Sequence, residues 1–230
     1  MDLNTEIKMA LSAERFGTYL TQCNNCVDNA AKLYLWNMSA ASAFFPWLSV
    51  AEVVLRNRIH EALVQIHGSE WPWMSGFERT LPNPKSPSVF NPHRELANTR
   101  EKYKKDRQTG KVVADLKFAF WQQMLKKNHK IPLWNKHLYV AFPNLDASLG
   151  ITTNRNQLYN RVEKIRILRN RIAHHEPIFA RNLYADYQNV IDLMKTSSSP
   201  EFIDWVASGQ YIGSCGAKEP YLAFLLQNRP

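Results

Sequence analysis

The stretch 154–174 reads NRNQLYNRVEKIRILRNRIAH and decides the fold class. Its apolar residues recur every three or four positions, the spacing at which side chains share one face of an α-helix. The residues of this stripe are Leu158, Val162, Ile165, Leu168 and Ile172. A long helix with one continuous apolar face is typical of a helical bundle, because that face must be buried against other helices. We therefore expect a core helix over residues 154–174.

Comparable periodic segments cover most of the remaining chain, and the alternation typical of β-strands is absent from the sequence. Ser12 has the residue type and position of an N-cap for a first helix. The other segments with helical spacing are 26–42, 46–68, 92–107, 113–127, 181–195 and a short one that begins at Pro200. The sequence therefore predicts an all-α fold, a helical bundle with a proline-rich insertion and extra helices.

Length and composition indicate one domain that spans residues 1–230. With 45% hydrophobic and 12% aromatic residues, a chain of 230 residues can bury a sizeable core. Residues 69–92 contain five prolines and are predicted to form an irregular loop within this domain. Residues 186–230 are predicted to form a C-terminal helical extension.

The charge balance favours an anionic partner. The chain carries 29 basic and 20 acidic residues, a formal net charge of +9, and nucleic acid is the commonest polyanion that such a protein meets. No run of 18 apolar residues exists, and the first residues lack the basic and apolar regions of a signal peptide. We therefore expect a cytoplasmic protein that has no membrane partner.

The cysteine and histidine spacings do not favour a metal site. Cys23 and Cys26 have the spacing of zinc ligands, but a zinc site needs a second pair, and Cys215 is the one cysteine left. Adjacent side chains diverge, so His174 and His175 do not form a chelating pair. We expect no metal ion and no cofactor.

Arg169 occupies an unusual position in the helix 154–174. In angle it falls inside the apolar stripe, where a guanidinium is costly unless it is paired or faces a cleft. His174 comes five residues later, about 140° around an ideal helix. The two side chains can converge only across a groove, or if the helix end loosens ahead of Pro177.

The chain nearly repeats this stretch, because residues 54–61 read VLRNRIHE. In that copy the spacing from arginine to histidine is one residue shorter. The residue out of place is Glu52, which lies upstream of the copy and falls inside an apolar stripe. Glu52 can pair with Arg56 or with Arg169 in a contact between helices. A buried Glu52–Arg169 salt bridge with a purely structural role is the alternative to a functional site.

Several blocks of the sequence together resemble a known family. The residues from Arg169 through Asn170 to His174 match the R-x4-6-H motif of HEPN domains, in which a polar residue often follows the arginine. The blocks SAERFGTYL (12–20), Phe44–His60 with its AEVVLRNRIH, FAFW (118–121) and LRNRIAHHEP (168–177) occur in the order seen in the Abi-like (abortive infection) branch of that superfamily. The resemblance spans roughly residues 12–185.

The resemblance implies an all-α HEPN-like fold and a metal-independent endoribonuclease, often a toxin of bacterial phage defence. It also implies a homodimer in which two motifs face one cleft, and an antitoxin, either protein or small RNA, that restrains the toxin. Carried over by position, Arg169 and His174 form the motif pair, and Asn170 is the polar second residue.

The residue types suit this chemistry. RNA is cleaved without a metal when its 2′-OH attacks the adjacent phosphate, which leaves a 2′,3′-cyclic phosphate and a 5′-OH. A histidine moves a proton near neutral pH, the role expected for His174, and an arginine stabilises charge on phosphate, the role expected for Arg169. Asn170 is expected to hold a phosphate oxygen or orient His174, with Glu52 in support. His175 is either a second acid/base or a residue that favours the helix dipole.

Two clusters of basic residues interleaved with aromatic residues are candidates for binding RNA. Their basic members are Lys102, Lys104, Lys105 and Arg107 in the first, and Lys126, Lys127 and Lys130 in the second. Each cluster can equally be a solvated helix end. Two other functions stay open: a non-catalytic RNA-binding or regulatory module with the HEPN fold, and a helical bundle that binds only proteins.

Overall fold

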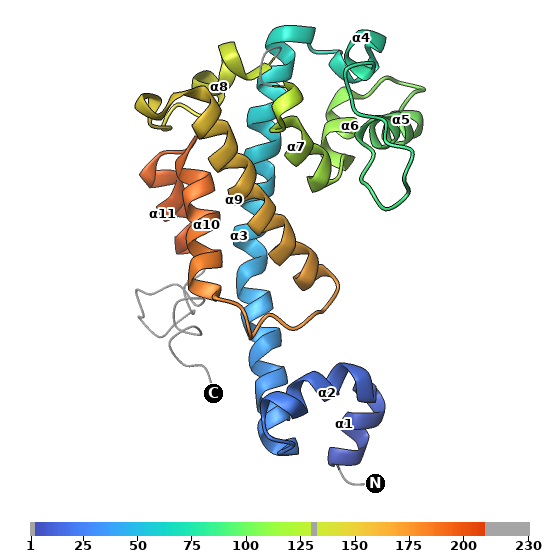
Figure 1. The fold of residues 1–230 in the computed structure, drawn as a ribbon, viewed down its shortest axis with the longest axis vertical. Helices are drawn as coiled ribbons and strands as arrows, with labels where there is room; N and C mark the ends of the chain where they lie inside the picture. The colour runs from blue at the N-terminus through green and yellow to red at the C-terminus, as the bar shows by residue number, and fades with distance from the viewer. Residues whose placement is uncertain (1–2, 130–132, 210–230) are drawn as a thin grey trace.

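A computed structural model describes residues 3–129 and 133–209, and within these ranges every regular element is helical. The predicted all-α class is therefore confirmed. Figure 1 shows an elongated molecule in which one long helix, α3, runs almost the full length and the other helices are arranged around it. The first two helices lie at one end of α3, and α4, α5 and α6 lie near the other end.

Helix α3 covers Val27–His67 without interruption, so the prediction of two helices, 26–42 and 46–68, is wrong. The boundary was expected at Pro46, since proline lacks an N–H group and disrupts a helix interior. In the structure Pro46 lies inside the helix. Because Pro46 has no N–H group, the carbonyl of Ser42 loses its hydrogen-bond partner in the helix. Ser42 is exposed, and both residues line an open groove, so this carbonyl remains accessible to water.

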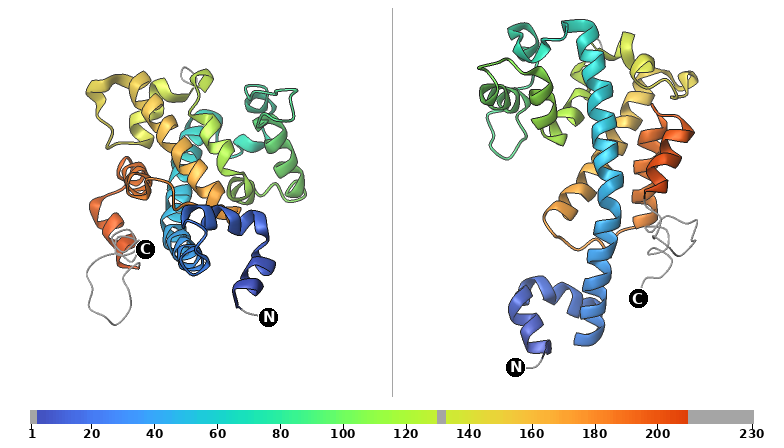
Figure 2. Two further views of the ribbon diagram at one scale, coloured as in Figure 1. Left: turned by 60° about the horizontal axis from the view of Figure 1, so that its bottom comes forward. Right: turned by 180° about the vertical axis from the view of Figure 1, so that it is seen from behind.

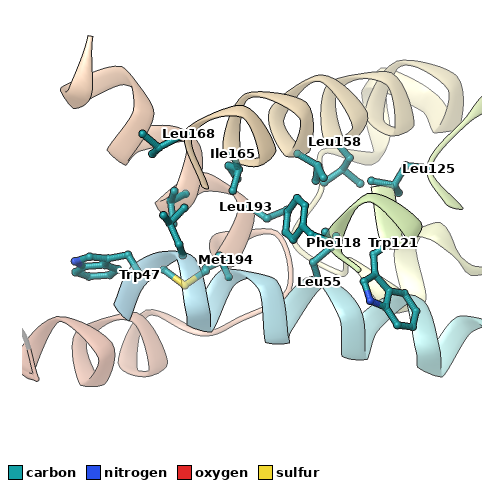
Figure 3. Close-up of a cluster of buried hydrophobic side chains, with 14 of the residues drawn as sticks. Trp47, Leu55, Phe118, Trp121, Leu125, Leu158, Ile165, Leu168, Leu193 and Met194 are labelled. Atoms are coloured by element: carbon teal, nitrogen blue, oxygen red, sulfur yellow. The ribbon is translucent and has the colours of Figure 1, made fainter. Parts of the chain in front are cut away.

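Helices α9 (Gly150–Ala173) and α10 (Leu183–Lys195) pack on α3 and on each other. The expected stripe of α9 forms this contact: its first four members are buried, and Ile172 is half-buried. Figure 3 shows the core between these helices, to which α7 also contributes. The labelled residues that meet there include Leu55, Phe118, Leu158, Ile165, Leu193 and Met194.

Shorter helices complete the fold, with the first two (blue in Figure 2) at one end of α3 and the others around this core. They are α1 (Leu3–Leu11), α2 (Ala13–Gln22), α4 (Ser75–Glu78), α5 (Pro92–Lys102), α6 (Thr109–Asp115), α7 (Phe118–Met124), α8 (Asn135–Ala141) and α11 (Pro200–Ser208). Ser12 caps α2 as predicted, since its hydroxyl accepts from the backbone N–H of Arg15.

The helix predicted over 113–127 is in fact two helices, α6 and α7. The chain is extended at Leu116 and Lys117 between them. The indole of Trp121 donates to the carbonyl of Leu116, which holds the bend. The break lets both segments bury apolar side chains that a single straight helix would direct elsewhere.

Within residues 69–92, a 3-10 turn at Trp71–Trp73 and the short helix α4 precede an irregular stretch that ends at Asn91. Within residues 186–209, most of α10 packs on the core and α11 packs on α10. Residues 210–230 of the predicted extension lie outside the described residues, as does Lys130.

Among the described residues, α3 is the one helix that is long and apolar enough to span a membrane. The core helix of a soluble protein can have the same length and composition as a membrane span. One apolar face of α3 is buried in the bundle. The cytoplasmic location stays a prediction.

Stability should depend on pH through His129, whose pKa is lowered by burial to about 4. Below the ordinary histidine pKa of about 6.5, His129 is protonated in the unfolded chain. In the folded chain it stays neutral until the pH falls to about 4. His129 should therefore not change the free energy of unfolding above pH about 6.5. That free energy should fall by about 3 kcal/mol as pH drops through this window. Urea unfolding of wild type and His129→Gln between pH 7.5 and 4.5 checks this, and equal pH dependence of the two proteins would contradict it.

Candidate functional site

Arg169 and Glu52 face each other across a groove between α9 and α3. The groove has a volume of about 320 Å³, and its charged lining residues are Glu52, Arg56 and Arg169. Apolar side chains, among them Phe45 and Ile172, make up most of the remaining lining. A small hollow with two guanidinium groups and one carboxylate carries a net positive charge, which suits a phosphate group.

The contact between Arg169 and Glu52 is a loose ion pair. The Nε of Arg169 lies 3.7 Å from Oε2 of Glu52, and the two side chains are 43% and 25% exposed. Of the two partners that the sequence left open for Glu52, Arg56 and Arg169, the structure places Arg169 opposite the carboxylate, and the pair is not buried. At this distance the carboxylate orients the guanidinium without a close hydrogen bond. No hydrogen bond is found for the other N–H groups of Arg169 within the described part of the chain.

The C-terminal end of α9 is a Schellman turn with a histidine at its left-handed position. Helix α9 ends at Ala173 with His174 as C-cap, and His175 has φ of 55°. The N–H of His175 donates to the carbonyl of Ile172, and the N–H of Glu176 donates to that of Arg171, the two bonds of this motif. Glycine is the usual residue there, so His175 adopts a strained conformation.

Two arginine side chains brace this turn, one from α2 and one from the end of α9 itself. Arg15 of α2 donates to the carbonyl of His175 at 2.7 Å. Arg171 donates to the carbonyl of Pro177 at 3.2 Å and lies 3.6 Å from the carboxylate of Glu176. Sequence reasoning missed the role of Arg15, because the two groups are 160 residues apart in the chain. The backbone around His174 is therefore fixed by contacts from both sides.

His174 is exposed directly after the helix end and lines neither the Arg169 groove nor the groove next to it. Asn170 is half-exposed on the last full turn of α9 and also lies outside the groove lining. Within one chain, the structure therefore brings Arg169 to Glu52 but does not bring His174 to Arg169. His174 is free to contact a molecule placed over the end of α9.

A second, larger groove adjoins the first. Its volume is about 560 Å³, and it shares Phe45, Ile172 and Ala173 with the Arg169 groove. The side chains of His175 and Glu176 lie along its edge, and Tyr19 and Tyr34 contribute aromatic surface. The two grooves together form a hollowed surface around the end of α9.

Asn37 of α3 fixes the loop that leads away from this surface. In Figure 1 that loop crosses α3 to reach α10. The buried Oδ1 of Asn37 accepts from the backbone N–H groups of Ile178 at 2.7 Å and Phe179 at 3.1 Å. Both bonds join segments far apart in the sequence, so Asn37 sets the path of the chain after His174.

Replacing Asn37 by alanine should destabilise the protein by about 2 to 5 kcal/mol, because two buried N–H groups lose their partner. Ser39→Ala on the same helix serves as the control, since its hydroxyl bonds only to the carbonyl of Leu35 one turn earlier. That variant should stay within about 0.5 kcal/mol of wild type. Urea unfolding measures both, and equal stability of the two variants would contradict the assigned role of Asn37.

The near-repeat at 54–61 has structural contacts. The Nδ1 of His60 accepts a hydrogen bond of 2.9 Å from the indole of Trp71, and burial lowers the pKa of His60. Arg56 donates to the carbonyl of Ala114, and its buried Nε has no partner in the structure. His60 is therefore committed to packing, whereas His174 is exposed to solvent.

The first predicted RNA-binding cluster is largely neutralised by acidic neighbours. Lys102 pairs with Asp115 at 2.8 Å and Lys104 with Glu101 at 2.6 Å. Arg107 lies 3.8 Å from the carboxylate of Glu70 and stacks over the ring of Trp73. Lys105 is exposed. In the second cluster, Lys126 and Lys127 line a separate pocket that has no acidic residue among its described lining residues.

Cys23 and Cys26 are free thiols, half-buried and exposed respectively, and Cys215 is outside the described residues. Among the residues that the structure describes, no three metal-ligating side chains gather at one point.

Comparisons with protein-family models, with curated proteins and with solved structures return no match. The all-helical fold and the geometry around Arg169 are therefore the observations on which a functional proposal rests.

Proposed function

We propose that the protein is a metal-independent endoribonuclease of the HEPN type, with Arg169 and His174 as its catalytic pair. The observation that carries the proposal is the Arg169 side chain, which is 43% exposed in a groove and lies 3.7 Å from the carboxylate of Glu52. A structural ion pair would favour closer, better-buried groups. An arginine that lines a groove and whose N–H groups have no hydrogen-bond partner among the described residues is suited to binding a phosphate.

Each residue has a defined part in the proposed reaction. His174 takes the proton from the 2′-OH of the RNA or gives one to the leaving 5′ oxygen. Arg169 neutralises the charge that develops on the phosphate oxygens. Asn170, on the same turn of α9, contacts a phosphate oxygen or orients His174. His175 has the backbone role of a turn residue, since its φ of 55° and its bond from Arg15 fix the helix end.

A homodimer is part of the proposal, because one chain does not bring His174 to the Arg169 groove. The surface beside the grooves supports it. Apolar side chains on α3 are exposed there, at 63% for Leu35, 53% for Met38 and 65% for Phe45. Such a patch is typical of an interface between chains. Sedimentation at micromolar concentration should give a dimer, and a Phe45→Lys variant should be monomeric and inactive.

The resemblance of residues 12–185 to Abi-like proteins extends the proposal to a toxin of bacterial phage defence that an antitoxin restrains. A non-catalytic RNA-binding module is the alternative.

Cleavage of a defined oligonucleotide separates the two. Purified protein should cut an RNA in excess EDTA and should fail on the same strand with 2′-deoxyribose at the cleaved position, because the attacking hydroxyl is then missing. Binding without cleavage of either strand would favour the non-catalytic module. Cleavage of both strands would show that the 2′-OH is not the nucleophile.

A further inference from the structure

A separate pocket, lined mainly by polar and charged residues, lies at the N-terminal half of α9, away from the two grooves. It lies between the first turns of that helix and the 3-10 turn Lys127–His129. Its volume is about 570 Å³. The lining residues are Lys126, Lys127, Asn128, Thr152, Arg155, Asn156 and Tyr159. Three of them are cationic and none is acidic, so the described lining has a charge of +3 that no carboxylate within it offsets.

Arg155 is the unusual residue of this pocket, because its side chain is buried without an ionic partner among the described residues. The residue is 4% exposed. Its Nη1 donates to the carbonyl of Leu125 and its Nη2 to the amide oxygen of Asn156. Its Nε is buried and makes no hydrogen bond. Burial also lowers the pKa of Arg155. A buried guanidinium that meets only neutral oxygens is costly, and a bound anion would offset that cost.

The two lysines at the rim are available to a ligand. Lys127 is exposed and Lys126 is half-exposed. Glu163 lies within electrostatic range of Lys126, but its carboxylate is held by Arg166 at 2.7 and 2.8 Å and also accepts from Gln122. That carboxylate is therefore committed to other donors. The contrast with Lys102 and Lys104, which each have a close carboxylate, sets this pocket apart.

The remaining lining suits a nucleoside. Tyr159 is half-buried, packs against the core and also lines the pocket, where an aromatic ring can stack on a base. Thr152 provides a hydroxyl. Asn156 accepts from Arg155 through its amide oxygen, which leaves its NH₂ group to donate to a ligand. A volume of about 570 Å³ also exceeds what a bare phosphate ion fills and falls in the range of small-molecule sites.

We propose that this pocket binds a nucleotide, with its phosphate between Lys126, Lys127 and Arg155 and its base against Tyr159. The nucleotide is either free or one unit of an RNA strand, since the phosphate chemistry is the same. Fourteen residues separate Arg155 from Arg169, about 21 Å along an α-helix. One phosphate cannot contact both, so this site is distinct from the proposed catalytic groove and does not depend on it.

The test uses the full-length chain and two probes that it cannot cleave. One is an equimolar mixture of the four nucleoside 5′-monophosphates. The other is a 2′-O-methyl oligonucleotide, which has the phosphates of RNA but no attacking hydroxyl. Because neither probe is a substrate, failure of the proposed ribonuclease activity leaves the binding measurement interpretable. Calorimetry gives the affinity of each, and repeating it at several salt concentrations gives the salt dependence.

The variant is the double substitution Lys126→Gln and Lys127→Gln, since replacing the buried Arg155 risks unfolding the protein. The matched control is Lys111→Gln with Lys164→Gln, which removes the same charge from exposed positions outside the pocket. The pocket variant should bind at least one probe about tenfold more weakly, and the control should bind like wild type. For the oligonucleotide, the slope of log K against log salt should shrink by about 0.7 for each phosphate that the variant no longer neutralises.

The two probes identify the source of the nucleotide. A weaker affinity for the monophosphates assigns the pocket to a free nucleotide, and a weaker affinity for the oligonucleotide alone assigns it to an RNA strand. If the pocket variant and the control lose affinity for the probes equally, the loss reflects net charge alone and the proposal is overturned. Failure of wild-type protein to bind either probe would overturn it as well.

Discussion

Replacing His174 by alanine is expected to lower the rate of RNA cleavage by about two to four orders of magnitude, the usual contribution of a general acid/base. The substitution should leave the fold intact, because the side chain is exposed just beyond the end of α9. Thermal unfolding of the variant should match wild type, and single-turnover cleavage of a labelled RNA measures the rate.

His175→Gly is the matched control for that change. The backbone of His175 is left-handed, with φ of 55°, a conformation that glycine adopts without strain. The variant should be as stable as wild type, or more stable by up to about 1 kcal/mol. It should keep cleavage within about tenfold of wild type. A large loss in His175→Gly together with an active His174→Ala would transfer the acid/base role to His175.

Replacing Arg169 by alanine should lower the cleavage rate by about two to three orders of magnitude, since a fixed cation no longer stabilises the charge on the phosphate. Arg169→Lys should be intermediate, because lysine keeps the charge but loses the planar fork that grips two phosphate oxygens. Stability should change by no more than about 1 kcal/mol, as is usual for an ion pair this exposed.

Arg58→Ala controls for the loss of a half-exposed, ion-paired arginine. Its side chain is 37% exposed and bonds to Glu61 at 2.9 Å, compared with 43% exposure for Arg169. Arg58 lies in the near-repeat of the motif and outside the groove lining. Cleavage by this variant should equal that of wild type. If both variants lose activity alike, the effect reflects net charge and not the groove.

The core of the bundle was predictable because it depends on local periodicity. Leu158, Val162, Ile165 and Leu168 of α9 are all buried, as are Leu55 and Ile59 in the apolar stripe of α3 that contains Glu52. The angular positions of Arg169 and Glu52 around their helices also singled out these two residues, whose charged groups lie 3.7 Å apart. A charge inside an apolar stripe can be recognised without knowledge of the neighbouring helix.

Features that depend on distant contacts could not be predicted. Pro46 was expected to begin a helix, but α3 continues through it where the groove leaves the affected carbonyl accessible. Asn37 and Arg15 hold the loop after α9 through bonds that span more than 140 residues. Lys126 and Lys127 could be recognised in the sequence as part of a basic cluster. The buried Arg155 beside them could not be told apart from any other charged residue on a helix.

The most direct test of the central claim compares the products of wild-type protein and His174→Ala on one end-labelled RNA in the presence of EDTA. Wild type should leave fragments with 2′,3′-cyclic phosphate and 5′-OH ends, and the variant should leave the RNA intact over the same time. Cleavage by His174→Ala at the wild-type rate, or wild-type fragments that carry 5′-phosphate ends, would contradict this claim.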